Sequence, residues 1–249
     1  MAVSLQRPVG LAQNPSREAQ GVSPESARKT LGDSPLFRGL APSERNALIA
    51  RVKIRTFAAG DTIFLMGSVQ SSVMAIIDGE VKVSISADGK EAVLAILQPG
   101  EVFGEIAMLD GKPRSADATA QRACTLAVLE RRDVLAALER SPAAWLGLVE
   151  LLCSRLRQTD QHLVEIAFLG LPARLAKLLL RVIEEDPRTN VPSAHLSQSE
   201  LANMVGAARE NVNKCLQEWQ RAGIIQMKTR FITVTNRVRL EAVAQSDYR

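Results

Sequence analysis

The first half of the chain carries short hydrophobic runs separated by polar turns, which is typical of a β-rich domain. A helix is predicted at residues 42–52, followed by six short strands: Lys53–Phe57, Thr62–Met66, Val73–Ile77, Glu80–Ser86, Glu91–Leu97 and Cys124–Glu130. Asp88-Gly89 is the strongest hairpin signal among the turns. Lys82 and Ser84 alternate with Val and Ile, so we expect that strand to have one face open to solvent. Many short strands of this kind predict a sandwich, barrel or jelly roll.

The pattern then changes to a helical period. Residues 133–169 are predicted to be helical, with a break at Ser141-Pro142, because proline suits a first helical turn. After this break a seam recurs at alternating spacings of four and three residues: Trp145, Val149, Leu152, Leu156, Thr159, Leu163 and Ile166. This is a coiled-coil register, and after an all-β domain it favours a two-fold homodimer over packing within one chain.

Leu169-Gly170-Leu171-Pro172 interrupts the helix and predicts a hinge or domain boundary. We expect the following elements beyond it: a helix at 173–185, a loop at 186–195, two short helices, strands at 224–227 and 231–234, and a helix from Arg237. Residues 1–34 contain no aromatic residue, so we expect a disordered tail there. The expected domains are a tail at 1–34, a β domain at 35–140, a dimerisation helix at 141–170 and a C-terminal domain at 171–249.

Composition excludes several classes of protein. No run approaches the roughly eighteen apolar residues of a membrane span, and the N-terminus has no signal-peptide pattern. Three scattered cysteines and two histidines give no disulfide framework, metal site or nucleophile constellation, so we expect a reduced, cytoplasmic, non-enzymatic protein without a cofactor. Residues 171–249 hold 12 Lys and Arg against 8 Asp and Glu, and the remainder holds 19 of each sign. The whole net charge of +4 therefore lies in the last third, which points to nucleic acid.

Residues 197–216 have the pattern of a helix-turn-helix. Ser197 and Glu200 fit a capping box, and Ala202 is small where a second helix must cross closely. Gly206 permits the positive φ that the turn between the helices needs. An ordinary helical hairpin in a core is the alternative, but these positions together favour DNA binding.

The second of these helices begins with polar residues suited to base edges: Arg209, Glu210, Asn213 and Lys214. Arginine can bond bidentately to guanine, and a glutamate can accept a hydrogen bond from cytosine. On the strand pair that follows, Lys228 and Arg230 are expected to contact phosphate, as is Arg221.

Residues 103–116 have the composition of an anion site. Phe103-Gly104-Glu105 precedes a short apolar stretch at 106–109, and the N–H groups at such a helix start attract an anion. Arg114-Ser115 adds a guanidinium fork and a hydroxyl that suit a phosphodiester, and Glu105 suits a ribose hydroxyl. The residues alone leave open a nucleotide site or a structural Glu105–Arg114 ion pair.

Both motifs resemble those of one family. Phe103-Gly104-Glu105-Ile106-Ala107 and Pro113-Arg114-Ser115-Ala116 are similar to the phosphate-binding cassette of cyclic-nucleotide-binding domains. The helix-turn-helix with Arg209-Glu210 resembles that of the Crp/Fnr superfamily of transcription regulators, and the resemblance spans about residues 36–240. It implies an α+β fold with an N-terminal β jelly-roll cyclic-nucleotide-binding domain, a long coiled-coil dimerisation helix and a C-terminal winged helix-turn-helix.

The resemblance also implies cyclic AMP as the ligand. It places the following residues around that ligand: Gly104, Glu105, Ile106, Ala107, Arg114, Ser115, Arg155, Thr159 and Asp160. Arg155 and Thr159 match positions that close over the nucleotide from the long helix, with Thr159 reaching the adenine amino group. Thr159 also occupies a core position of the seam, where a polar side chain is costly without a partner.

Asp160 departs from the family, in which the opposite subunit contributes a serine at this position. Arg155 and Asp160 flank the seam at the spacing of interhelical ion pairs. Asp160 is therefore expected to pair with the partner subunit's Arg155 or to accept from an exocyclic amine, and cyclic GMP stays open as a ligand. Ala208 and Lys214 also replace the family's usual Ser and Arg, which weakens the expectation for the outer bases of a TGTGA-like half-site.

These observations predict a homodimeric, ligand-regulated transcription regulator that binds DNA palindromes and, as the resemblance implies, RNA polymerase. Ligand would shift a pre-existing equilibrium at the segment 168–172. Arg114→Ala is expected to abolish the nucleotide response while leaving folding intact. The alternatives are a cyclic-nucleotide effector that acts through a protein partner, and a regulator of this superfamily that answers another signal. Iron–sulfur and haem sensors are disfavoured, because the tail has no cysteine and the two histidines are scattered.

Overall fold

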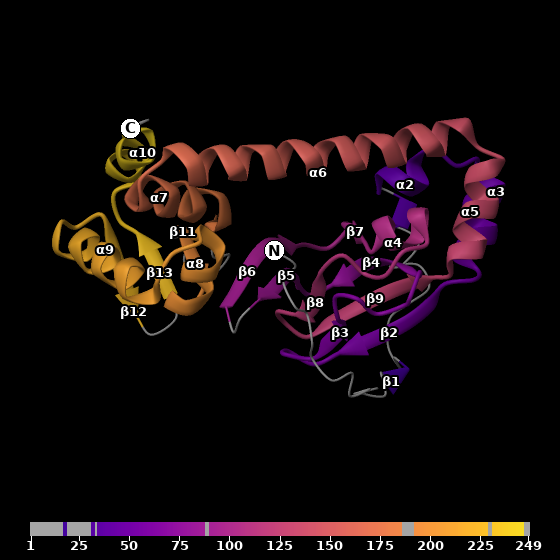
Figure 1. The fold of residues 1–249 in the computed structure, drawn as a ribbon, viewed down its shortest axis with the longest axis horizontal. Coiled ribbons are helices and arrows are strands. Elements are labelled where there is room, and N and C mark those ends of the chain that lie inside the picture. Colours follow the sequence, from indigo (N-terminus) through magenta and orange to yellow (C-terminus); the bar gives the residue numbers. More distant parts are fainter. Residues whose placement is uncertain are drawn as a thin grey trace, which may run out of the picture.

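The computed structural model describes residues 17–18, 31–32, 34–87, 90–185, 192–228 and 231–246. One long helix, α6, runs along the N-terminal β-roll and ends at α7 of the C-terminal domain, most of which lies on the same side of α6 as the β-roll (Figure 1). The expected turn at Asp88-Gly89 lies outside the described residues.

The β-roll consists of two antiparallel sheets with the strand orders β1-β2-β9-β4-β7 and β3-β8-β5-β6. Their strands are β1 (Arg17–Glu18), β2 (Lys53–Phe57), β3 (Thr62–Phe64), β4 (Val73–Asp78), β5 (Val81–Ala87), β6 (Lys90–Leu97), β7 (Val102–Phe103), β8 (Asp117–Ala120) and β9 (Cys124–Leu129). The helices of this domain are α2 (Pro35–Arg38), α3 (Pro42–Ile49), α4 (Glu105–Asp110) and α5 (Arg131–Glu139).

Two of these strands, β4 and β9, are buried on both faces. Ile76 and Leu126, each 0% exposed, pack between the sheets, whereas Ala75 and Leu129 pack against the helices. This position explains why both segments are continuous apolar runs and do not alternate with polar residues.

Three sequence expectations for this domain need correction. A disordered tail was expected at residues 1–34; this is wrong at two places that the structure describes, because Arg17–Glu18 pairs with β2 and Leu31 is 0% exposed within the core, and most of the segment lies outside the described residues. β8 was not expected because its Asp-Ala-Thr-Ala sequence has low strand propensity, yet small residues fit where Ala118 is 0% exposed. Ser84 was expected to face solvent but is 1% exposed, because a register shift between Val83 and Ser84 interrupts the alternation of β5, and its hydroxyl then contacts Glu91 on the neighbouring strand.

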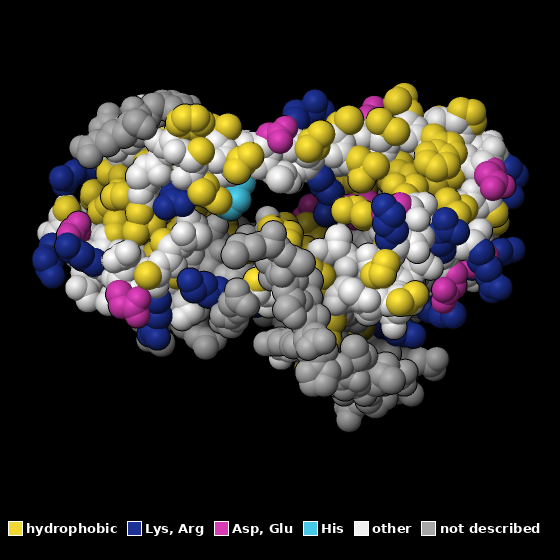
Figure 2. All heavy atoms as spheres, viewed as in Figure 1, with side chains coloured by type: hydrophobic (Ala, Val, Ile, Leu, Met, Phe, Trp, Pro, Cys, Tyr) yellow, Lys and Arg dark blue, Asp and Glu magenta, His cyan; other side chains and the backbone are white. Residues whose placement is uncertain are grey.

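The long helix α6 (Pro142–Phe168) begins where the sequence predicts a break. The Ser141 hydroxyl accepts from Ala144 N at 3.3 Å and donates to Gly39 O at 2.8 Å, which caps the helix and ties it to the β-roll. Most of the seam lies exposed along one edge of α6: Trp145, Val149, Leu156, Leu163 and Ile166 are 39–64% exposed (Figure 2). No helix in the described part of the chain is long and apolar enough to cross a membrane.

The C-terminal domain combines helices with a small antiparallel sheet of order β10-β11-β13-β12. Its elements are α7 (Leu171–Val182), β10 (Glu184–Glu185), β11 (Pro192–His195), α8 (Gln198–Val205), α9 (Arg209–Arg221), β12 (Ile225–Lys228), β13 (Phe231–Val234) and α10 (Arg237–Gln245). The expectation of a loop throughout 186–195 is wrong at its end, because β11 pairs with β13, with proline at the first position of the strand. Leu175, Leu201 and Leu216, each 0% exposed, form the core.

Candidate ligand-binding and DNA-binding sites

The cassette predicted at residues 103–116 starts with a glycine that its geometry requires. Gly104 has φ +81°, a left-handed conformation that ends β7 and caps α4. A Cβ at this position would lie 2.4 Å from Arg114 Nη1 and 3.1 Å from Ser72 O, so the guanidinium would have to leave its place. Gly104 therefore permits both the sharp turn and the approach of the guanidinium.

Arg114 is a buried cation, 3% exposed, that is held by the backbone. Its Nη1 donates to Gly104 O at 3.0 Å and its Nη2 to Ser72 O at 2.7 Å, while the guanidinium lies 4.1 Å from the Phe64 ring centroid. Burial lowers the pKa of Arg114 to about 10, opposed by the charge of Glu105, so the group stays cationic at neutral pH. Its Nε is buried without a hydrogen-bond partner in the described part of the chain.

Glu105 joins the cassette to the long helix. This carboxylate is 2% exposed, and its Oε1 lies 3.5 Å from Arg155 Nε on α6. Arg155 Nη2 donates to Val102 O, so Arg155 is engaged within its own chain. The alternative of a structural Glu105–Arg114 ion pair is wrong, because the ion pair that Glu105 forms is with Arg155 and the Nη donors of Arg114 bind backbone carbonyls.

The structure thus brings together Gly104, Glu105, Arg114 and Arg155, whereas the other predicted ligand residues lie around this group. Ala107 is 2% exposed and Ile106 is 46% exposed, both on α4. Ser115, Thr159 and Asp160 are exposed. The Thr159 hydroxyl donates to Arg155 O at 3.0 Å, one turn back along α6.

The helix-turn-helix has the predicted local geometry. The Ser197 hydroxyl accepts from Glu200 N at 3.2 Å and Glu200 Oε2 accepts from Ser197 N at 2.6 Å, which confirms the capping box. Gly206 ends α8 at φ +62° and has open space around it, so its conformation and not its size requires glycine. Ala202 is 3% exposed.

The first turns of α9 carry the predicted base-reading residues. Arg209, Glu210 and Lys214 are exposed, as is Lys228 at the end of β12, whereas Arg230 lies outside the described residues. Asn213 is half-buried, and its Oδ1 accepts from Gln198 Nε2 at 3.0 Å. Gln198 was not singled out from the sequence; it is a positioning contact that only the packing of α8 on α9 reveals.

The remaining reactive side chains lie outside these two sites. Burial raises the pKa of both Cys124 and Cys215 to about 11, which leaves them as unreactive core thiols. Within the described ranges, no group of three or more His, Cys, Asp and Glu side chains could hold a metal ion.

Comparison with known proteins places the chain in a family. The profile "Cyclic nucleotide-binding domain" matches residues 54–141, and the profile "Crp-like helix-turn-helix domain" matches residues 173–243. The "Cyclic AMP receptor protein" of Thermus thermophilus is 32% identical over 212 residues, covering 85% of this chain and 97% of that protein. The "CRP-like cAMP-activated global transcriptional regulator" of Mycobacterium tuberculosis is 30% identical over 210 residues, covering 82% of this chain and 94% of that protein.

Solved structures agree with this assignment. A CRP/FNR-family transcriptional regulator from Thermus thermophilus superposes with a TM-score of 0.67 at 25% identity, covering 78% of this chain and 99% of that chain. The chain belongs to the Crp/Fnr family of transcription regulators, with a cyclic-nucleotide-binding domain followed by a DNA-binding helix-turn-helix. The fold class predicted from the sequence is confirmed.

Proposed function

We propose that this regulator is a homodimer that responds to cyclic AMP and then binds TGTGA-like palindromes. One observation carries the ligand assignment: Arg114 is 3% exposed, yet its Nε has no hydrogen-bond partner among the residues that the structure describes. A buried guanidinium donor without an acceptor is costly, and an anionic phosphodiester oxygen would satisfy it. The names of the relatives, which are cyclic AMP receptors, support the same ligand class.

The charge of the cassette fits a cyclic phosphate better than an open one. Arg114 and Arg155 are cations and Glu105 is the anion between them, so the three groups carry a net charge of +1. A cyclic phosphodiester has a single negative charge, whereas a terminal phosphate has about −1.5 to −2 at neutral pH. The buried carboxylate therefore disfavours a nucleoside monophosphate with an open phosphate.

The long helix supplies the contacts proposed for the base. Thr159 and Asp160 are exposed on α6, one turn beyond Arg155. Because Arg155 already contacts Glu105 and Val102, we favour Asp160 as an acceptor from the exocyclic amine over a pair with the partner subunit's Arg155. A ligand held between the cassette and α6 would compete for the Glu105–Arg155 contact, and this links occupancy to the position of the helix.

The exposed seam of α6 is the proposed dimer surface. Two reading helices would then lie about 34 Å apart and enter successive major grooves, with Arg209 and Glu210 on base edges. The segment 168–172, between α6 and α7, would set their angle. The partners under this proposal are double-stranded DNA, a second copy of the chain and RNA polymerase.

Calorimetric titration of the full chain with cyclic AMP, cyclic GMP and 5′-AMP tests the ligand. We expect cyclic AMP to bind most tightly and 5′-AMP at least about tenfold more weakly, since its second charge meets Glu105. Fluorescence anisotropy on a TGTGA palindrome and on a scrambled duplex, with and without cyclic AMP, tests the response. Absence of binding to all three nucleotides, or DNA affinity that no nucleotide changes, would overturn the proposal. A footprint confined to the palindrome separates it from an effector that acts through a protein partner.

Asp160→Ser tests the base contact separately. We expect the ratio of cyclic AMP to cyclic GMP affinity to change, while Gln158→Ser, an exposed neighbour on the same helix, leaves the ratio as it is. An unchanged ratio in Asp160→Ser would remove Asp160 from the site and leave the phosphate contacts unaffected.

A further inference from the structure

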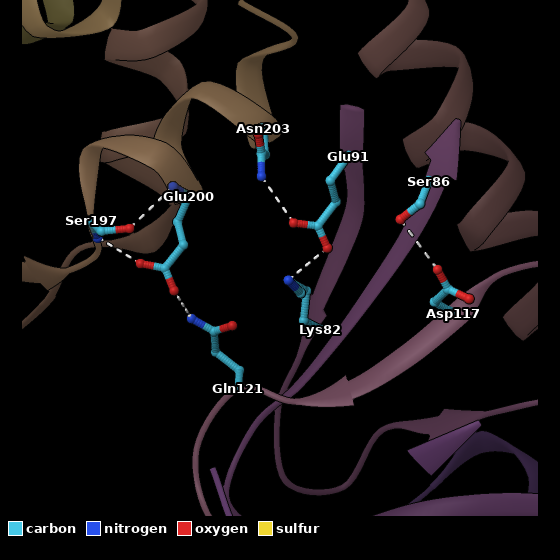
Figure 3. A network of polar contacts seen from close by, with 8 residues as sticks. All are labelled: Lys82, Ser86, Glu91, Asp117, Gln121, Ser197, Glu200 and Asn203. Carbon is cyan, nitrogen blue, oxygen red and sulfur yellow. Dashed lines mark hydrogen bonds and ion pairs between the residues drawn. The ribbon is translucent and has the colours of Figure 1, made fainter. Parts of the chain in front are cut away.

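The first helix of the helix-turn-helix is fastened to the β-roll of its own chain. α8 packs against β6, and two hydrogen bonds join the domains (Figure 3). Asn203 Nδ2 donates to Glu91 Oε2 at 2.9 Å, and Gln121 Nε2, between β8 and β9, donates to Glu200 Oε1. We call these four residues, Glu91, Gln121, Glu200 and Asn203, the α8 clasp.

Both carboxylates of the α8 clasp are oriented by a second contact. Lys82 Nζ lies 2.6 Å from Glu91 Oε1, and the other Glu200 oxygen accepts from the Ser197 N–H. Burial alone would raise the pKa of Glu91, but hydrogen bonds from Lys82 and Ser84, the charge of Lys82 and a weaker hydrogen bond from Asn203 outweigh it, so the pKa is lowered. Glu91 therefore meets Asn203 as an ionised, fixed acceptor, which makes a stronger hydrogen bond than a neutral one.

The hairpin that carries Glu91 has little support of its own. β5 pairs with β8 only as far as Ser84, where the pairing of β5 with β6 also shifts register. Beyond this point, residues 85–87 and 90–92 form a two-stranded ribbon at the edge of the sheet. A two-stranded ribbon is marginally stable by itself. The Ser86 hydroxyl donates to Asp117 Oδ2 on β8 at 3.4 Å, and the docked helix α8 adds further support by covering the edge strand β6 (Figure 3).

The base of the same hairpin packs in the apolar core beside Phe64, which contacts Arg114 of the cassette. Phe64, whose ring lies under the Arg114 guanidinium, packs in one apolar cluster with Val81 and Leu97, the first residue of β5 and the last residue of β6. Arg114 thus contacts Phe64, Phe64 belongs to the same apolar cluster as the base of the hairpin, and the paired strands of the hairpin extend from there to Glu91 and α8.

The α8 clasp leaves the DNA-reading side of the domain free. At about 100° per residue, Glu200 and Asn203 lie roughly 140–200° around α8 from Gln198. Gln198 is the residue of α8 that contacts Asn213 on the reading helix. The β-roll therefore holds the domain from the side turned away from Gln198 and Asn213, so it fixes the orientation of the domain and does not block its reading residues.

We propose that the α8 clasp couples the nucleotide site to DNA binding, by making the orientation of the DNA-binding domain depend on the β5–β6 hairpin. The inference rests on the proposed function, because it assigns a route to that response. Without the clasp hydrogen bonds, the two domains of a chain remain joined through α6, the segment 168–172 and the packing of α8 against β6, and nucleotide binding in the β-roll has less influence on the orientation of the reading helix.

A double-mutant cycle tests the coupling. Glu91→Ala, Asn203→Ala and the double variant are compared with Glu101→Ala, an exposed carboxylate of the same β-roll. The measured quantity is the ratio of the DNA dissociation constants without and with saturating cyclic AMP. We expect each clasp variant to lower this ratio by about fivefold or more, the double variant to add little, and Glu101→Ala to match wild type. By reciprocity, the effect of DNA on cyclic AMP affinity falls by the same factor.

Hydrogen exchange of the full chain, without nucleotide or DNA, provides a second readout. In Asn203→Ala we expect residues 85–87 and 90–92 to exchange faster than in wild type. Unchanged exchange would overturn the clasp, and faster exchange with an unchanged ratio would overturn its coupling role. If cyclic AMP does not change the DNA affinity of the wild-type protein, both the proposed function and the coupling role are wrong. If the wild-type protein responds to cyclic AMP and the clasp variants respond equally, only the coupling role is wrong.

Discussion

The cassette and the reading helix both depend on an arginine, but they hold it in opposite environments. Arg114 is 3% exposed, lies over an aromatic ring and has both Nη groups bound to carbonyl oxygens. Arg209 is exposed at the first turn of α9, where the backbone is fixed by the capping box of α8 and by Gly206. In the first region the fold orders the side chain itself; in the second it orders only the helix that presents the side chain.

This difference teaches what each site can recognise. A buried guanidinium that is held by Gly104 O and Ser72 O has few N–H donors left, so it suits one small anion in one geometry. An exposed guanidinium on a rigid helix stays adaptable, and under the proposed function DNA would supply its final order. Substitution of the two arginines should therefore affect ligand binding, DNA binding and stability in different proportions.

The largest effect is expected from Arg114→Ala. The change removes the donors to Gly104 O and Ser72 O and the cation over Phe64, so we expect the free energy of unfolding to fall by about 2–4 kcal/mol. This revises the expectation from the sequence that folding stays intact. Cyclic AMP affinity should fall at least about a hundredfold, because a charged hydrogen-bond donor to the phosphate is lost. Denaturant titration and calorimetry measure the two effects, and a variant with wild-type stability and cyclic AMP binding would contradict the cassette.

Arg209→Ala should show the opposite signature. We expect specific DNA affinity to fall by about 1–3 kcal/mol, while stability and cyclic AMP affinity stay at wild-type values, because the side chain is exposed. Anisotropy with the palindrome and with a scrambled duplex separates base reading from general attraction. A loss of the same size on both duplexes would show that Arg209 contacts phosphate and not a base.

The reading helix could be predicted from the sequence because each of its signals is local. Ser197 with Glu200, and the positive φ at Gly206, are short-range requirements that leave a pattern along the chain. The same holds for the break before Pro142, where one proline and one capping serine suffice.

The cassette could be predicted only in part, because its contacts are long-range. Its motif identified Gly104, Glu105 and Arg114, but the partners Ser72 and Phe64 are polar and apolar residues without a distinguishing pattern. The burial of Ser84, and with it the α8 clasp, arises from polar contacts with Glu91 that no periodicity records. Strand propensity also failed for β8, where close packing of the two sheets outweighs it.

A smaller, nonspecific effect is expected from Lys228→Ala. Lys228 is exposed at the end of β12, where a point charge can contact phosphate. We expect a similar weakening on the palindrome and the scrambled duplex, and a reduction of the salt slope by about one. Anisotropy titrations at several salt concentrations measure both. An unchanged slope would place Lys228 outside the DNA surface and restrict that surface to α9.

The smallest effect is expected on the pH dependence of stability, at His162 on α6, the helix that joins the β-roll to the C-terminal domain. His162 is half-buried near the end of α6. Burial is the main cause that lowers the pKa of His162; the charge of Glu165 raises this pKa, and the charges of Arg181 and Arg174 lower it, so that the pKa is lowered overall. Because the pKa of His162 is lower in the folded chain, the unfolded chain binds a proton on this imidazole more readily. The contribution of His162 to the free energy of unfolding is therefore complete above about pH 6.5 and is lost as the pH falls below that value. Denaturation of wild type and His162→Gln at pH 7.5 and 5.5 checks this, with the exposed Gln161→Ala as control. We expect the pH-dependent loss to be smaller in His162→Gln only, and equal losses in all three proteins would assign the effect to other groups.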